Sequence, residues 1–526
     1  MGNSLLKRSL EWFRASWVYI IIFCILFSLR VVAINNKTTF FFDDPASLNV
    51  STPQNVQEDG KKIKYGWADL RFDYGRNYTA LEIKKTLFES KSDIKSIVSD
   101  LVYLHNKTLD AQHPNLYYSI LRIWTAGMDY SDNNAIKWRG CSLNLVFFTL
   151  SFFFMFKLLN LIKPDKKFIA LGLFFAFVTT GTISNTLLIR PYPMFEAFLI
   201  SSIYIFVKVF KSIEKNELLP PKKVVLYGLG LGLFFLSDYY SLFMGAFIFM
   251  ALCYRCSATK NIQWLKWIFL MFLIAFGFVY LFCPLYFSNY KTIEHMTETQ
   301  NQANIWNFLF FIQYGIYLLT FLSKFIFNNI VFFMILFVLF SIGVPILNDN
   351  KLEKEEWRKW LLVVVPTFSW MYLICIISPF HEPAAVRYII IGFPIIGLVL
   401  AYITYRLRKL YAILIVLLTI ITVSLPIFEN ITWYNSKYKC LGEMTYFNDY
   451  GWLNVSESAY NAQTGKNRPI IVINKNWLFP SYLLYLKNNA IIRFEKEIPP
   501  ANKNFIFDDY IILILNITGA HIIDNN

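Results

Sequence analysis

Long runs of apolar residues recur along the whole chain and are separated by short polar segments. Most are close to the roughly 20 residues that a helix needs to cross the hydrocarbon core of a membrane. About eleven runs are of this kind: residues 17–34, 141–160, 168–188, 191–209, 224–236, 239–254, 264–283, 331–347, 361–377, 388–405 and 411–427. The sequence therefore predicts a polytopic α-helical membrane protein. The two short runs on either side of Asp238 are interpreted as broken helices.

Composition and charge agree with this class. Apolar residues make up 56% of the 526 positions and charged residues only 16%, which is too apolar for an ordinary soluble protein. The net charge is +15, but the lysines and arginines form short clusters between the apolar runs instead of one basic face. Such clusters are typical of membrane topology, so we expect no nucleic-acid partner.

The distribution of cations orients the predicted spans. Basic residues precede the first run and no small-residue cleavage site follows it, which predicts a signal anchor with a cytoplasmic N-terminus. Alternate loops are then rich in lysine and arginine, whereas the short loops between them hold few cations: Arg190, Lys291, Lys324 and Arg387. This asymmetry places residues 35–140 and 428–526 on the exoplasmic side.

Two amphipathic segments leave the number of spans open. Residues 116–126 and 305–327 are expected to lie along the outer membrane surface, because counting either one alone as a span would reverse the lysine pattern. The prediction is about eleven spans, or about thirteen if both segments cross.

The two long polar regions are predicted to fold outside the membrane. Residues 35–140 are too long for a simple connection and form a large first exoplasmic loop within a membrane domain of residues 1–427. The tail, residues 428–526, is predicted to be a small C-terminal α/β domain. Its predicted elements are strands at 468–473 and 505–514 and a helix at 478–487.

Asp43 and Asp44 stand directly after the first span. Acids at a membrane boundary are costly unless they are solvated, paired or used, so they indicate function by default. Two adjacent carboxylates can hold different protonation states or bind a divalent cation together. The alternative is an interfacial turn that ends the helix.

The end of the first loop carries a second polar group. Asp110 and His113 precede an aromatic helical segment that includes Tyr117. His113 could carry a proton or bind a ligand, or it could serve as a cap partner. The tyrosines are also typical interfacial anchors.

A hairpin between two predicted spans contains Arg190 and Tyr192. A guanidinium suits phosphate through its charge and its two-pronged hydrogen bonding. Alternatively, Arg190 reaches out to lipid headgroups or pairs with Glu196 inside the bundle.

A later hairpin carries His381, Glu382 and Arg387, which form a second polar rim on the same predicted side. Asp238 is a further acid within the membrane region, and its alternative role is a helix-end cap.

The order of these motifs resembles that of the GT-C membrane glycosyltransferases. The similar branch is the bacterial one related to protein O-mannosyltransferases and to the lipid A aminoarabinose transferase. Members have Leu-Arg at the end of the first span, then an Asp-Glu pair, a His-Pro-Pro-Leu-Tyr-Tyr stretch, an Arg-Pro-Tyr hairpin and a late Arg-Tyr followed by proline. Here these motifs begin at Leu29, Asp43, His113, Arg190 and Arg387. The chain departs from the pattern at Asp44, where the family has Glu, at Asn115, where it has proline, and in a longer first loop.

The resemblance implies a GT-C fold and transfer of a sugar from a polyprenyl-phosphate donor to a hydroxyl of a lipid, glycan or protein acceptor, with inversion. It also implies an integral protein of a bacterial inner membrane, with the site facing the periplasm or exterior. Asp43, Asp44 and Asp110 are the implied catalytic acids, with Asp43 as general base. The implied substrate or phosphate contacts are His113, Tyr117, Arg190, Tyr192, His381, Glu382 and Arg387. Relatives differ in metal dependence, so a divalent cation stays open, with Asp43, Asp44, Asp110 and His113 as its ligands.

A transporter or lipid flippase is the alternative from another class, because charged groups inside a bundle also mark substrate paths. The large first loop and the polar tail argue against it.

Overall fold

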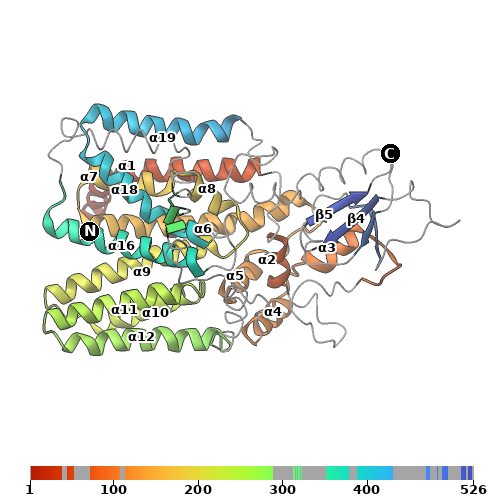
Figure 1. Cartoon of the computed structure of the whole chain (residues 1–526), viewed down its shortest axis with the longest axis horizontal. Helices are drawn as coiled ribbons and strands as arrows, with labels where there is room; N and C mark the ends of the chain where they lie inside the picture. Colours follow the sequence, from red (N-terminus) through yellow and green to blue (C-terminus); the bar gives the residue numbers. More distant parts are fainter. Residues whose placement is uncertain are drawn as a thin grey trace.

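The computed structural model describes residues 2–37, 44–52, 72–106, 113–287, 351–377, 388–429, 470–473, 488–495, 511–516 and 519–523, with single positions between 312 and 322 and at 483. A helical bundle forms one part of the molecule, and a small sheet lies beyond one of its ends (Figure 1).

The bundle consists mainly of apolar helices of different lengths. They are α1 (Gly2–Asn36), α6 (Asn133–Ile162), α7 (Lys166–Phe177), α8 (Thr180–Leu187), α9 (Tyr192–Glu214), α10 (Pro221–Phe235), α11 (Ser241–Ala258), α12 (Gln263–Phe282), α16 (Lys354–Ile377), α18 (Phe393–Arg406) and α19 (Lys409–Glu429), with the 3-10 turn η2 (Ile390–Gly392) before α18.

Six of the helices in the described ranges are long and apolar enough to cross a membrane: α1, α6, α9, α11, α12 and α16. Helices α7 and α8 make a seventh if the bent pair is one span. The predicted polytopic helical class is therefore confirmed. The total of about eleven spans stays a prediction, because residues 331–347 and most of 305–327 lie outside the described residues.

The predicted run at 168–188 is broken, with a bend of 55° between α7 and α8. Thr179 caps α8 by accepting from the Thr182 backbone N–H, and Arg30 of α1 donates to the carbonyl of Phe177 at 2.9 Å. These side chains bond backbone groups that lose their helical partners at the break. Inside a membrane such groups must be paired within the protein. The break expected beside Asp238 is instead a turn between α10 and α11, and α11 alone is long enough to cross.

Helices α10 and α12 approach each other closely through two glycines. A Cβ at Gly228 would lie 2.9 Å from the Met271 carbonyl oxygen, and one at Gly232 would lie 3.1 Å from that of Ala275. Small residues four positions apart allow such backbone contact between membrane helices.

The first loop folds into short helices at one end of the bundle (Figure 1). They are α2 (Asp44–Ser51), α3 (Ala80–Phe88), α4 (Ile94–Asn106) and α5 (Leu116–Trp124). Helix α5 has nine residues, too few to span, so the segment at 116–126 adds no span.

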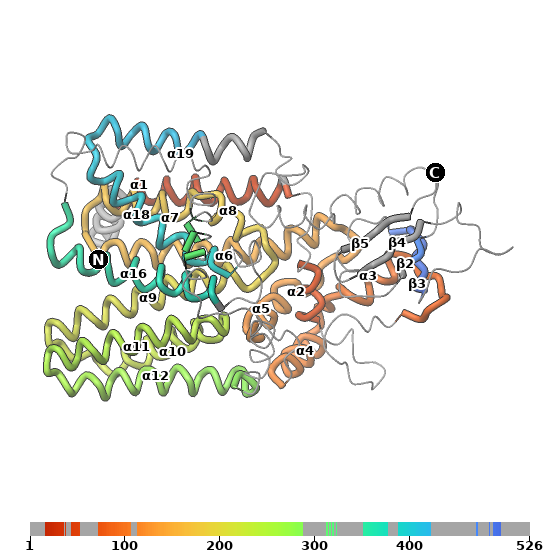
Figure 2. The backbone as a smooth tube through the Cα atoms, in the orientation of Figure 1, coloured from red at the N-terminus to blue at the C-terminus, as the bar shows by residue number. Residues whose placement is uncertain are grey.

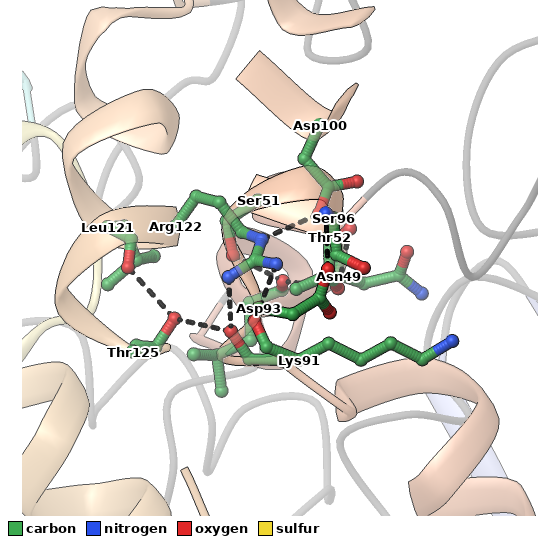
Figure 3. A network of polar contacts seen from close by, with 12 residues as sticks. Asn49, Ser51, Thr52, Lys91, Asp93, Ser96, Asp100, Leu121, Arg122 and Thr125 are labelled. Carbon is green, nitrogen blue, oxygen red and sulfur yellow. Dashed lines mark hydrogen bonds and ion pairs between the residues drawn. The ribbon is translucent and has the colours of Figure 1, made fainter. Parts of the chain in front are cut away.

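A buried arginine joins α4 to α5 (Figure 3). Arg122 Nε donates to Asp100 Oδ2 at 2.6 Å, Nη1 to Ser90 Oγ at 3.0 Å and Nη2 to the Lys91 carbonyl at 2.8 Å. The guanidinium thus ties two loop helices and the turn before α4 into one unit.

The sheet combines the first loop with the tail. Its strands are β1 (Asn77–Thr79), β2 (Ile470–Ile473), β3 (Ile491–Glu495), β4 (Ile511–Asn516) and β5 (Gly519–Ile523), in the order β1-β3-β2-β4-β5. Figure 2 shows the sheet at the same end of the molecule as the loop helices.

Pairing in the sheet is mixed. β2 pairs in parallel with β3 and β4, and β1 is antiparallel to β3, with Tyr78 opposite Ile492. The described parts of the strands predicted at 468–473 and 505–514 are β2 and β4, whereas β1, β3 and β5 were not expected. The predicted helix at 478–487 has only Leu483 among the described residues.

Candidate functional site

Asp44 is the first residue of α2 and is completely buried. Its Oδ2 lies 2.6 Å from Lys37 Nζ, and its Oδ1 accepts from the Ile189 backbone N–H at 2.7 Å. Lys37 also donates to the Leu187 carbonyl. The carboxylate therefore holds the start of α2 against the segment that follows α8. Asp43, the neighbouring acid, lies outside the described residues.

Arg190 lies between α8 and α9 and is buried. Its Nη1 is 3.4 Å from both Ser47 Oγ and Tyr118 Oη, and its Cζ is 5.9 Å from the centre of the Tyr192 ring. Glu196 accepts instead from Asn185 Nδ2 at 2.9 Å. Arg190 is thus held among polar and aromatic side chains inside the protein and does not reach out to lipid headgroups.

Two tyrosines of α5 face this region. Tyr117 and Tyr118 are completely buried, with their ring centres 5.7 Å apart. Burial, with the charge of Asp44 as a second cause, raises the pKa of Tyr117 well above its ordinary value. Tyr117 is therefore a neutral O–H group, and its hydroxyl has no hydrogen-bond partner within the described part of the chain.

His113 and Asp238 form a buried pair that joins the first loop to the turn between α10 and α11. His113 Nδ1 lies 2.9 Å from Asp238 Oδ2, and Asp238 Oδ1 accepts from the Tyr240 backbone N–H at 2.8 Å. The bond to Tyr240 closes the turn before α11, and the N-cap of this helix has no side-chain hydrogen bond, so Asp238 is not its cap. Sequence reasoning did not include Asp238 in the site, although an acid within an apolar stretch was a visible signal.

Aromatic rings connect the two halves of this cluster. The ring centre of Tyr192 lies 5.6 Å from that of His113 and 6.1 Å from that of Tyr388, which precedes η2. The structure therefore brings together Asp44, His113, Tyr117, Arg190 and Tyr192 at the loop end of the bundle. The other site predictions, Asp110, His381, Glu382 and Arg387, lie outside the described residues, as does Asp43.

A metal site is not built by the described residues. No group of three or more His, Cys, Asp or Glu side chains suited to a metal occurs among them. Asp44 already contacts an ammonium group, and of the four candidate ligands only His113 keeps an unpaired donor atom, Nε2, within the described residues.

The fold and this cluster define a polytopic helical membrane protein with a buried polar and aromatic site at one end of its bundle. Neither a scan against protein-family models nor a search of curated proteins gives a match.

Solved structures with a similar course of the chain are archaeal oligosaccharyltransferases. AglB from Archaeoglobus fulgidus, in complex with an inhibitory peptide and a dolichol-phosphate, is 10% identical at a TM-score of 0.40, over 92% of this chain and 65% of that one. The Archaeoglobus fulgidus oligosaccharyltransferase in complex with Zn and sulfate is 11% identical at a TM-score of 0.40, over 90% and 62%. This chain thus spans less than two thirds of either neighbour, and likeness at this level assigns no activity or ligand to it.

Proposed function

We propose that this protein is a GT-C type membrane glycosyltransferase. It transfers a sugar from a polyprenyl-phosphate donor to a hydroxyl of a lipid, glycan or protein acceptor. The observation that carries the proposal is the meeting of three separate motif segments: Asp44 accepts from Ile189 N–H, and the His113 ring packs against Tyr192. A resemblance in motif order gains weight when the motifs also meet in space.

The proposed reaction is a single displacement at the anomeric carbon. The acceptor oxygen forms a bond to this carbon as its proton passes to the Asp43 carboxylate, and the bond from the carbon to the phosphate oxygen breaks. The leaving polyprenyl phosphate keeps the electron pair. Asp44 is buried and contacts Lys37 and Ile189, which fixes the start of α2. In this proposal Asp44 is therefore an anchor, and Asp43 is the base.

Arg190 is the proposed phosphate contact, with Arg387 as its predicted partner. Preorganised cations stabilise the charge that develops on a leaving phosphate. Ser47 and Tyr118 lie against Arg190 Nη1 and restrict its rotation, which lowers the cost of holding it in place. Asp110 is proposed to lie near the acceptor. The site is proposed to face the periplasm or exterior of a bacterial inner membrane.

The test is transfer of radiolabelled sugar from polyprenyl-phosphate-sugar in membranes that carry each variant. We expect Asp43→Asn to abolish transfer and Arg190→Met to lower it by roughly 10²–10³-fold. Arg139→Met is the matched control, because it makes the same change at an exposed arginine of α6. Undiminished transfer by Asp43→Asn would remove Asp43 as the base, and dissipation of a solute gradient without transfer would support a transporter.

A further inference from the structure

The Asp238 side chain makes two hydrogen bonds, and the direction of only one of them is set by the partner alone. Its Oδ1 accepts from the Tyr240 backbone N–H, which can only donate, so an acceptor is required at that position. Its Oδ2 lies 2.9 Å from His113 Nδ1. A carboxylate accepts at both oxygens, so the proton of this bond belongs to Nδ1.

The other ring nitrogen of His113 is unpaired within the described part of the chain. His113 is completely buried, and its Nε2 has no hydrogen-bond partner among the residues that the structure describes. The rings of Tyr192 and Tyr388 lie beside it, with centres 5.6 and 6.5 Å away. Buried polar atoms are normally paired, so an orphaned one points to a missing partner.

The chemistry of Nε2 decides what that partner is. A second proton on the ring would leave a charged N–H without an acceptor in this environment, which costs more than a neutral nitrogen without a donor. With the proton on Nδ1, Nε2 carries a lone pair and can only accept. An ionised phosphate also only accepts, so it does not fit, whereas a hydroxyl does.

We propose that Asp238 is a positioning residue that holds His113 in the Nδ1–H form, so that Nε2 accepts a hydrogen bond from a hydroxyl of the bound substrate. The proposal rests on the proposed glycosyl transfer and specifies one contact within it. The hydroxyl belongs either to the transferred sugar or to the acceptor, and both present the same O–H group to Nε2.

Two conservative variants separate the roles of the pair. In His113→Asn the amide N–H can still donate to Asp238, but nothing replaces Nε2. In Asp238→Asn the requirement of Tyr240 N–H keeps the oxygen on its side, so the new NH₂ group faces Nδ1 and forces the proton onto Nε2. The first variant removes the acceptor, and the second converts it into a donor.

We expect both variants to lower kcat/KM for sugar transfer by about tenfold or more, the range of a lost hydrogen bond. A raised KM for the donor with an unchanged KM for the acceptor identifies a sugar hydroxyl, and the reverse identifies the acceptor hydroxyl. His105→Asn is the control, since the ring of this exposed histidine of α4 contacts the Leu281 carbonyl and its neighbour Asn106, away from the His113 pair.

Wild-type kinetics in His113→Asn would overturn the proposal, because Nε2 would then be dispensable. Retained transfer in Asp238→Asn together with loss in His113→Asn would also overturn it. Nε2 would then act as a hydrogen-bond donor, for example to a phosphate oxygen. Solid-state nitrogen NMR of the wild-type protein, labelled at its five histidines, tests the pair without any variant. Absence of a neutral Nδ1–H signal would refute the assignment, even if no polyprenyl donor supports transfer and the proposed function itself fails.

Discussion

Lys37 Nζ lies 2.6 Å from Asp44 Oδ2, and neither side chain is exposed. The pair joins the end of α1 to the start of α2, and Ile189 adds a backbone N–H on the other carboxylate oxygen. Both carboxylate oxygens of Asp44 are therefore bonded within the protein.

Asp44→Ala is expected to lower the free energy of unfolding by about 3–5 kcal/mol, since it leaves the Lys37 ammonium buried without its partner. Adding Lys37→Met should recover part of this loss. Unfolding in detergent micelles measures both. An Asp44→Ala protein as stable as the wild type but inactive in transfer would make Asp44 a chemical group and not an anchor.

Arg122→Met is expected to loosen the first loop, because it leaves Asp100 buried without its cation (Figure 3). The expected cost is about 3–5 kcal/mol, and Arg122→Met with Asp100→Leu should cost less. Limited proteolysis between α3 and α5 reports the change. Equal protease resistance in the wild type and the single variant would contradict a role of this network in holding the loop.

Lys84 of α3 predicts a pH dependence. Its Nζ donates to Asn133 Oδ1 at 3.1 Å and to Asn488 Oδ1 at 3.0 Å, and burial lowers its pKa from 10.5 to about 8. The folded state thus binds this proton more weakly than the unfolded state. The penalty for a buried ammonium is complete below pH 8 and disappears as the pH rises towards 10.5.

The wild type should therefore gain stability relative to Lys84→Met as the pH is raised across this window. The comparison of unfolding midpoints at several pH values measures the difference and cancels other titrating groups. A difference that is constant with pH would show that Lys84 keeps its ordinary pKa in the folded protein, and a difference that falls would show that its pKa is raised; either result contradicts the prediction.

The pairing of β1 with β3 can be tested by a disulfide. Asn77 lies opposite Arg493 in the antiparallel ladder, where Cα atoms are about 4.5–5.5 Å apart and within reach of a disulfide. Asn77→Cys with Arg493→Cys should cross-link under mild oxidation. Asn77→Cys with Glu495→Cys, two positions out of register, should not, and equal cross-linking of both pairs would refute the register.

Hydropathy was sufficient for the helical bundle because a bilayer imposes long apolar helices whatever their neighbours are. It missed the break between α7 and α8, since residues 168–188 form one apolar run. The break is stabilised by Arg30, which comes from another helix and which a local window does not contain.

The site was partly predictable. Motif order identified Arg190, His113 and Asp44, because these side chains are rare in such positions. It did not join His113 to Asp238, which lies 125 positions away. Strand β1 was also missed, since three residues carry no periodic signal and become a strand only beside β3.

The link between Lys84 and Asn488 spans 404 positions of the chain. At a synthesis rate of roughly 5–20 residues per second, roughly 20 to 80 seconds pass between synthesis of β1 and synthesis of its partner β3. The loop helices around Arg122 can form in that interval, but the edge of β1 stays unpaired. Pairing with the strands of the polar tail is therefore the last step in the folding of the first loop. If synthesis stops early, the loop lacks its partner strand.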